Sequence, residues 1–519
     1  MGVYLVGAGP GAEGLITVRG LELLKQADVI IYDHLVSPTL LHYTRSDAEL
    51  IYVGKQAGSH TLPQAEINAL MLEKGRLAAN SGGIVVRLKG GDPFLFGRGG
   101  EEMDALLQAG LDVEIVPGVS AAWAASAYAG IPLTHRGLAS SVALITGQAG
   151  RGNAEPDWER LGRGADTLVV FMGMARLQEI CRCLLASGLP ASRPAALVEW
   201  GTLGRQRKLV DTLGSIAAAA AAADFSAPAL LIVGEVAALG RTASWFEKKP
   251  LFNRTIAVTR SAAQAAEFSC LLQDLGAMPL ELPVLTIKPH PPDAFSDAVL
   301  QRLGDYAWLV FTSANGVKYF WELLAARGLD SRQLGTVRVA AIGPGTAAAL
   351  QERYIQPDFV PSVYVAEELA SGLGEQLRNT GEKAEPVLIL RGGLARPALE
   401  EGLRSFGIAV ETLNLYDTLL PAEAAYASGL QELLAALHNN RLDAITFCSS
   451  SAVDNFFRLL APEALAGKEL CLACIGPITA ERLKKYGLTC TVQADEYTLP
   501  GLAKALVAYF SSLSGGGCR

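Results

Sequence analysis

A glycine-rich turn near the start of the sequence has the composition of a nucleotide-binding site. The apolar run "VYLV" leads into "GAGPGAEG", in which Gly7 and Gly9 are two positions apart, and a helical pattern follows. A strand, a tight glycine turn and a helix in this order cradle many nucleotides. Asp33 ends the next apolar run, "VIIYD", where dinucleotide-binding proteins place an acid for the ribose. These residues predict a nucleotide-type ligand.

One residue of the turn, Pro10, argues against a dinucleotide. Ala12 occupies the slot of the third glycine in the dinucleotide fingerprint, although alanine is tolerated there. Pro10 removes a backbone amide from the loop that would bind a pyrophosphate. No Gly-Lys-Ser/Thr follows, which excludes a P-loop. The turn therefore suits a ligand with an adenosine and no phosphate, and an NAD-dependent oxidoreductase is the alternative.

A second glycine cluster follows a strand-like run in "VVRLKGGDPFLFGRGGEE". Gly90 and Gly91 allow close backbone approach, Asp92 is free to accept hydrogen bonds, and Pro93 ends the strand. The stretch "EIVPGVSAAWAASAYAG" then places a Pro-Gly turn before a helix of small residues. Taken alone, the Gly-Gly-Asp-Pro turn is also consistent with an ordinary loop.

The composition describes a multidomain, acidic protein. Its 519 residues exceed what one core holds, so two to four domains are expected. Apolar residues make up 50% and charged residues 18%, which excludes general disorder. The net charge of −8 argues against nucleic acid as a partner. Without an 18-residue apolar run or a signal peptide, the sequence predicts a cytoplasmic protein with no membrane contact.

The cysteines give little sign of metal or disulfide chemistry. Eight cysteines in a chain of this length do not form a disulfide framework. Cys471 and Cys474 form a C-x-x-C, but it lies in the apolar run "LCLACIG" with no second pair nearby. We expect buried thiols there rather than a metal or redox site, and no metal is predicted.

Strand-like and helix-like segments alternate along the chain, which predicts α/β domains with mostly parallel sheets. The charged, proline-containing stretch at 247–255 is the best linker, so we expect one domain over 1–246 and a second over 256–519. The second domain contains an internal repeat, because "FTSANG" and "IGPGT" recur as "FCSSSA" and "IGPIT". The repeat predicts two similar α/β lobes, lobe 1 at about 256–286 and 421–519 and lobe 2 at about 291–413.

The first half resembles uroporphyrinogen-III C-methyltransferase over about residues 1–246. The resemblance rests on "VGAGPG", "VGKQAG", "VRLKGGDPFLFGRGGEE", "VPGVSAAWAASAYAGIPLTHR", "FMGM" and "VEWGTLGRQR", in this order. It implies the tetrapyrrole-methylase fold, with two α/β lobes, S-adenosylmethionine in the cleft between them, and a homodimer formed through this half.

The resemblance also implies which residues act. The acid–base pair falls on Asp33 and Lys55. The chain departs from the family at Ala12 and Glu13, which replace an Asp-Pro-like pair, and at Trp123 in a helix of small residues. The cofactor positions are Pro10, Gly90, Gly91, Asp92, Leu95, Ser120, Ala121, Met172 and Gly201.

The acceptor of the methyl groups would be an electron-rich pyrrole carbon, and the sulfonium donor is already activated. Transfer then needs positioning more than a strong nucleophile, and Asp33 could remove the proton that must leave afterwards. The substrate is a polycarboxylate, which calls for basic side chains. Candidates in the motif loops are Arg87, Lys89, Arg98 and Arg136; surface ion pairs are the equal alternative for each.

The second half resembles uroporphyrinogen-III synthase over about residues 252–510, through the repeat, "LVFTSANGV", "IGPGTA" and "LYDT". The family fold is two α/β lobes joined by a two-stranded connector, expected near 285–290 and 414–420. Tyr416 matches a tyrosine proposed to assist water departure. The small polar turns are either ligand-binding rims or ordinary loops. As rims they would bind substrate carboxylates through Thr312, Ser313, Ser449, Ser450 and Thr479.

Together, the two resemblances imply a bifunctional enzyme. Its synthase half would cyclise hydroxymethylbilane to uroporphyrinogen III with inversion of ring D. Its methylase half would transfer two methyl groups from S-adenosylmethionine to C2 and C7, which gives precorrin-2 for sirohaem or cobalamin. An alternative is a methyltransferase whose second half binds a tetrapyrrole without catalysis.

Overall fold

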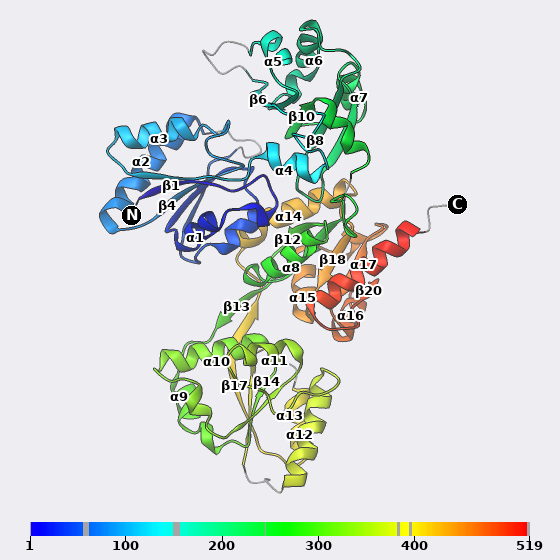
Figure 1. The fold of residues 1–519 in the computed structure, drawn as a ribbon. Helices are drawn as coiled ribbons and strands as arrows, with labels where there is room; N and C mark the ends of the chain where they lie inside the picture. The colour runs from blue at the N-terminus through cyan, green and yellow to red at the C-terminus, as the bar shows by residue number, and fades with distance from the viewer. Residues whose placement is uncertain are drawn as a thin grey trace.

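The computed structural model describes residues 2–54, 62–148, 156–243, 245–380, 385–393 and 397–515. Four five-stranded sheets organise this part of the chain, two in each half (Figure 1). Helices cover the sheets, so the α/β fold class predicted from the alternation of segments is confirmed. None of the described helices is long and apolar enough to cross a membrane.

The first sheet has the order β3-β2-β4-β1-β5, and every neighbouring pair of strands is parallel. Apolar side chains leave its strands on both faces, and both faces are buried. This explains why its strands read as continuous apolar runs. The elements of this unit are β1 (Val3–Gly7), η1 (Glu13–Leu15), α1 (Val18–Gln26), β2 (Val29–Tyr32), η2 (Pro38–Tyr43), β3 (Glu49–Tyr52), α2 (Gln64–Ser81), β4 (Val85–Lys89), α3 (Gly99–Gln108) and β5 (Val113–Val116).

The second sheet is mixed and has the order β6-β7-β10-β8-β9. Strand β10 runs antiparallel to both of its neighbours, and β9 runs antiparallel to β8. The elements are α4 (Ala121–Tyr128), β6 (Val142–Thr146), α5 (Trp158–Gly164), β7 (Thr167–Phe171), η3 (Met174–Arg176), α6 (Leu177–Ala186), β8 (Pro194–Glu199), β9 (Arg207–Thr212), α7 (Ile216–Ala222), β10 (Ala229–Val233) and η4 (Glu235–Arg241).

The third sheet, β12-β11-β18-β19-β20, is parallel and joins strands from both ends of the second half. Cys471 and Cys474 begin and end β19, where side chains three positions apart point to opposite faces, and they enter two different cores. The elements are β11 (Thr255–Val258), α8 (Ala262–Asp274), β12 (Met278–Glu281), α14 (Glu423–His438), β18 (Ala444–Phe447), α15 (Ser450–Leu459), η7 (Pro462–Leu465), β19 (Cys471–Cys474), α16 (Pro477–Lys484), β20 (Val492–Gln493) and α17 (Leu499–Gly515).

The fourth sheet, β13-β17-β16-β14-β15, carries the connection between the two synthase-like units. Strand β13 pairs antiparallel with the end of β17, where the resemblance of the second half implies a two-stranded connector at 285–290 and 414–420. In Figure 1 these strands lead to the lowest part of the molecule. The elements are β13 (Thr286–Pro289), α9 (Ala294–Gln301), η5 (Leu303–Asp305), β14 (Trp308–Phe311), α10 (Ala314–Ala326), η6 (Ser331–Leu334), β15 (Arg338–Ala341), α11 (Pro344–Gln351), α12 (Ala366–Thr380), β16 (Val387–Gly392), α13 (Ala398–Ser405) and β17 (Val410–Leu419).

The stretch expected to be a linker is packed against both halves. Leu251 is buried and its amide donates to the Leu275 carbonyl oxygen over 2.9 Å, while the Asn253 amide donates to the Gly204 carbonyl oxygen of the first half over 2.9 Å. The charged residues of this stretch made it look exposed, so the sequence did not indicate these two contacts.

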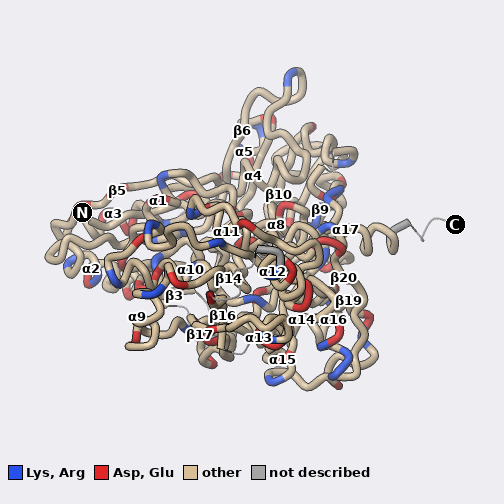
Figure 2. The backbone as a smooth tube through the Cα atoms, turned by 90° about the horizontal axis from the view of Figure 1, so that it is seen from below, with Lys and Arg blue, Asp and Glu red and all other residues tan. Residues whose placement is uncertain are grey.

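Figure 2 shows basic and acidic residues interspersed along the backbone rather than gathered on one basic face.

Candidate functional site

Three glycine loops converge at the carboxyl ends of β1, β4 and β5. The Gly9 amide donates to the Gly91 oxygen over 3.2 Å, and the Gly91 amide returns a bond to Gly9 over 2.7 Å. The Gly118 amide donates to Asp92 Oδ2 over 2.9 Å. A Cβ atom on Gly7 would lie 2.4 Å from the Gly118 Cα atom, so only glycine allows this approach.

Loops of the second sheet pack against these three glycine loops. A Cβ atom on Gly201, after β8, would lie 2.3 Å from the Ala125 Cβ atom in α4. The Ala12 amide donates to Thr202 Oγ1 over 3.0 Å, which joins the first loop to the loop after β8. The Phe171 ring lies 5.1 Å from the Phe96 ring between centroids. The loops of the two sheets are therefore in direct contact.

Backbone strain concentrates in the same loops. Of the nine described non-glycine residues with positive φ, five lie here: Phe96, Arg98, Met172, Trp200 and Thr202. Such conformations cost free energy and persist where surrounding structure imposes them, which is common at functional sites. The strain is an observation independent of the sequence motifs, and it falls on the same loops.

The residues predicted to bind the cofactor lie on these loops. Pro10, Leu95 and Asp92 are half-buried, and Met172 is exposed. Ser120 is buried, and its hydroxyl accepts a hydrogen bond from the Ala122 amide over 3.2 Å at the start of α4. Of the converging glycines, Gly91 has open space on its side-chain face, since a Cβ atom there would meet the Ala121 amide nitrogen at 4.0 Å. A backbone surface without a side chain suits a flat, uncharged group such as an adenosine.

Asp33 lies beside the second loop. Its Oδ1 accepts from the Leu35 amide over 3.2 Å, and its Oδ2 lies 3.4 Å from Arg87 Nη2. A Cβ atom on Gly90 would lie 2.7 Å from Leu35 Cβ, so the Asp33 turn contacts this loop. Its side chain is 24% exposed, which leaves it accessible to a ligand. Lys55, the other half of the expected pair, lies outside the described residues.

A buried ionic cluster precedes the second loop and was not anticipated. Arg87 and Lys89 point to one face of β4, and Glu102 of α3 is fully buried between them. Glu102 Oε1 lies 2.8 Å from Lys89 Nζ and 3.4 Å from Arg87 Nε. Burial, followed by the charge of Arg87, lowers the pKa of Lys89. Both cations thus have a protein partner, and their role in substrate binding stays a prediction.

Of the four basic residues predicted to bind substrate, the other two, Arg98 and Arg136, are exposed. Arg98 pairs with Glu101 over 2.6 Å at the start of α3, and its backbone is left-handed. Arg136 lies on the exposed turn in which the His135 amide donates to the Ala139 oxygen over 3.0 Å. Exposed side chains can turn toward a polycarboxylate at little cost, so these two fit the substrate role better than the buried pair.

In the second half, Tyr416 contacts the polar turn that contains Thr312 and Ser313, one of the turns predicted to bind substrate. Its hydroxyl lies 2.8 Å from Ser313 Oγ, and Ser313 also accepts from the Gly316 amide over 2.9 Å to cap α10. Burial raises the pKa of Tyr416, so the phenol stays protonated and can donate a hydrogen bond at neutral pH. Thr312 precedes this cap and is half-buried.

The rims of the two lobes face each other. Gln264 Nε2 of α8 donates to Asn315 Oδ1 of α10 over 3.0 Å. The repeat-related Tyr364 and Tyr497 rings meet edge to face, 6.3 Å apart. On the lobe 1 side Ser449 caps α15, Ser450 begins that helix, and Thr479 is buried in the first turn of α16.

Sequence reasoning missed the first rim of lobe 1. Arg260 Nε and Ser261 Oγ are buried without a hydrogen-bond partner directly after β11. Buried unpaired donors are rare and mark places where a ligand can bind. The signal was present, because Arg260 and Arg391 hold equivalent positions in the internal repeat.

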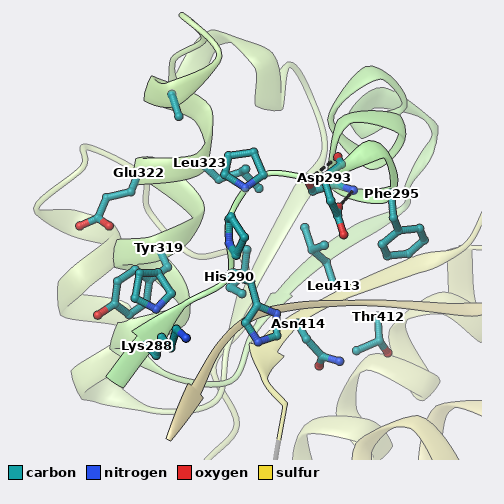
Figure 3. A pocket seen from close by; sticks show the side chains of 16 residues that line it. Lys288, His290, Asp293, Phe295, Tyr319, Glu322, Leu323, Thr412, Leu413 and Asn414 are labelled. Atoms are coloured by element: carbon teal, nitrogen blue, oxygen red, sulfur yellow. Dashed lines mark hydrogen bonds between the residues drawn. The ribbon is translucent and has the colours of Figure 1, made fainter. Parts of the chain in front are cut away.

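A cavity of about 660 Å³ lies beside β17 and α10 and belongs to neither constellation (Figure 3). His290 at its edge pairs with Asp417 over 2.9 Å. Tyr319 on its wall lies 5.5 Å from the Tyr416 ring. None of the residues predicted to act lines it, and no motif in the sequence indicated it.

Comparisons with known proteins match the two halves of the chain to two different families. Residues 2–217 match the model of the tetrapyrrole (corrin/porphyrin) methylases, and residues 266–504 match that of uroporphyrinogen-III synthase HemD. The chain is 38% identical to the porphyrin biosynthesis protein HemD of Ruminiclostridium josui over 97% of both chains. The chain belongs to the family of this HemD protein, in which both parts are joined. Both resemblances drawn from the sequence are thereby confirmed.

Further relatives of this HemD-family protein match mainly the methylase half. The uroporphyrinogen-III C-methyltransferase of Bacillus subtilis is 41% identical over 69% of this chain and 73% of its own. The siroheme synthase of Chromobacterium violaceum is 49% identical over 47% of this chain and 52% of its own. A structure of uroporphyrin-III C-methyltransferase from Thermus thermophilus, complexed with S-adenyl homocysteine, is 40% identical over 46% of this chain and all of its own, with a TM-score of 0.40.

Proposed function

We propose that the protein catalyses two consecutive steps of tetrapyrrole synthesis. Its second half cyclises hydroxymethylbilane to uroporphyrinogen III with inversion of ring D. Its first half transfers two methyl groups from S-adenosylmethionine to C2 and C7, which gives precorrin-2 for sirohaem or cobalamin. The observation that carries the proposal is the convergence of the glycine loops of a tetrapyrrole methylase in a chain that continues as a synthase.

In the methylase half, the converging loops would hold S-adenosylmethionine, which supplies an activated methyl group when bound. Gly91 has open space on its side-chain face, where the flat adenosine would lie, and Asp92 keeps its loop closed through the Gly118 amide. The loops orient the donor and exclude water, which is what transfer from an activated sulfonium requires. The proposed cofactor residues are those named from the sequence.

Asp33 is proposed as the base that accepts the ring proton after methylation, with Lys55 as its partner. Its accessible carboxylate, held by the Leu35 amide and Arg87, supports this role. Substrate carboxylates would bind Arg98 and Arg136, with Arg87 and Lys89 as further candidates.

In the synthase half, Tyr416 is proposed to donate a hydrogen bond to the departing hydroxyl. Its protonated phenol, held by Ser313, supports this role. The rest of the reaction requires that the flexible linear substrate, hydroxymethylbilane, be held in one curled conformation. Small polar groups at the facing rims would hold its carboxylates: Thr312, Ser313, Ser449, Ser450 and Thr479.

The proposal includes the organisation of the chain. We place the methylase at 1–246, a linker at 247–255 and the synthase at 256–519, with lobe 1 at about 256–286 and 421–519 and lobe 2 at about 291–413. The protein would act in the cytoplasm as a homodimer through its methylase half.

Methyl transfer from radiolabelled S-adenosylmethionine to purified uroporphyrinogen III tests the first activity. The Asp33→Asn variant should bind S-adenosylhomocysteine normally and lose at least about 100-fold in turnover, because a positioned base contributes about that much. Full turnover by the variant would refute the role of Asp33. Binding of NAD in place of S-adenosylhomocysteine would refute the methylase assignment itself.

A further inference from the structure

The two halves of the chain share a buried polar contact beside the first cofactor loop. Glu13, in η1 directly after that loop, is 9% exposed. The Cys270 thiol of α8 lies 3.1 Å from both of its carboxylate oxygens, and the Tyr43 hydroxyl of η2 donates to one of them. Burial, followed by the hydrogen bond to Glu13, raises the pKa of Cys270 to about 12, so the thiol remains a donor.

A second polar contact between the halves lies next to the first. His42 Nε2 of η2 is 2.8 Å from Glu281 Oε2 at the end of β12, and Ser269 of α8 donates to the other oxygen of Glu281 over 2.5 Å. Helix α8 and strand β12 therefore meet η1 and η2 through two carboxylates, one from each half. Figure 1 shows α8 and β12 beside the unit of the first sheet.

The other cofactor loop also ends on the synthase half. Gly204 follows the predicted cofactor residue Gly201 by three positions, and its carbonyl accepts from the Asn253 amide over 2.9 Å. A Cβ atom on Gly204 would lie 2.4 Å from the Gly276 oxygen, directly after α8. Ala12 and Thr202 join the two loops, so α8 and its flanks contact a connected pair of loops.

This contact gives a physical reason for a departure from the methylase pattern. The sequence replaces the Asp-Pro-like pair with Ala12 and Glu13. A buried carboxylate is stable only when donors surround it, and one of its donors here, Cys270, comes from the synthase half. Glu13 is thus a methylase residue that takes one of its hydrogen-bond donors from the synthase half and another, Tyr43, from its own half.

We propose that lobe 1 of the synthase is the outer support of the cofactor loops, so that ligand binding in the methylase cleft and docking of α8 are coupled. The proposal rests on the S-adenosylmethionine site of the proposed function. A ligand that orders the loops favours the docked arrangement, and docking favours the ligand by the same factor. The partner that this surface of the methylase fits is the second half of its own chain.

Hydrogen exchange of the full chain, with and without S-adenosylhomocysteine, tests the coupling. The ligand should slow exchange in its own loops and also in residues 262–281, which lie outside the methylase. Protection confined to residues 1–246 would overturn the coupling while leaving the methylase assignment intact. Failure of S-adenosylhomocysteine to bind at all would overturn both.

A pair of cysteine variants gives a second readout. Cys270→Ala leaves Glu13 with one donor fewer and should weaken S-adenosylhomocysteine about fivefold or more in calorimetric titration. Cys490→Ala removes a half-buried thiol of the same lobe that donates to the Val492 oxygen, away from the contact, and should leave the affinity unchanged. Equal affinities for Cys270→Ala and the unmodified chain would contradict the proposal. If Cys270→Ala does not fold, the exchange experiment on the unmodified chain still decides.

Discussion

Gly118→Ala should disable the methylase cleft while leaving the fold in place. The added Cβ atom would lie 2.2 Å from the Gly91 oxygen and 2.7 Å from Gly7 Cα, whereas real Cβ atoms essentially never come within 3.0 Å of such atoms. The loops must therefore separate by about 1 Å, and overpacking of this kind costs about 1–3 kcal/mol. The reciprocal bonds between Gly9 and Gly91, at 3.2 and 2.7 Å, would stretch first.

If that cost falls on the ligand-bound arrangement, affinity for S-adenosylhomocysteine drops roughly 5- to 150-fold. Isothermal titration calorimetry measures this directly. Gly100→Ala is the matched control, because a methyl group there meets nothing within 4 Å and helix propensity favours it. Native affinity in Gly118→Ala would refute the idea that contact between the loops forms the site.

Three further predictions concern other parts of the chain. Glu102→Gln should lower the free energy of unfolding by about 3–5 kcal/mol in urea titrations, since it leaves two buried cations poorly paired, whereas Glu101→Gln on the surface should cost under about 1 kcal/mol. Burial lowers the pKa of His42, but its hydrogen bond to Glu281 and nearby negative charge outweigh burial and raise it above 6.5. Its stabilising contribution is therefore full below that pH and is lost as the pH rises through the raised value; urea titrations of His42→Gln across this range should show a weaker pH dependence. Tyr416→Phe should slow formation of uroporphyrinogen III from hydroxymethylbilane at least about tenfold without changing methylation, and equal synthase rates would exclude its hydroxyl from the reaction.

The architecture was predictable because its determinants are local in sequence. Alternating apolar runs and helical patterns gave the α/β class, and the repeat indicated two similar units in the second half. The two motifs around Gly7 and Gly91 could be read as close-approach turns because glycine is the residue that permits such contacts. Their meeting in space followed from both lying at carboxyl ends of parallel strands.

What the sequence could not reveal depends on distant pairs. Glu102 reads as one of two acids opening a helix, and only the position of α3 against β4 buries it between two cations. Glu13 and Cys270 are 257 residues apart, so neither pattern nor propensity connects them. The stretch around Leu251 looks exposed by composition and is anchored by tertiary contacts.

A single coupled assay tests the central claim most directly. The purified full chain is given hydroxymethylbilane, first alone and then with S-adenosylmethionine, and the products are separated after oxidation. The account predicts the type III isomer in the first incubation and its conversion to precorrin-2 in the second. Only the type I isomer, which forms without an enzyme, or a type III product that never acquires methyl groups, would contradict it.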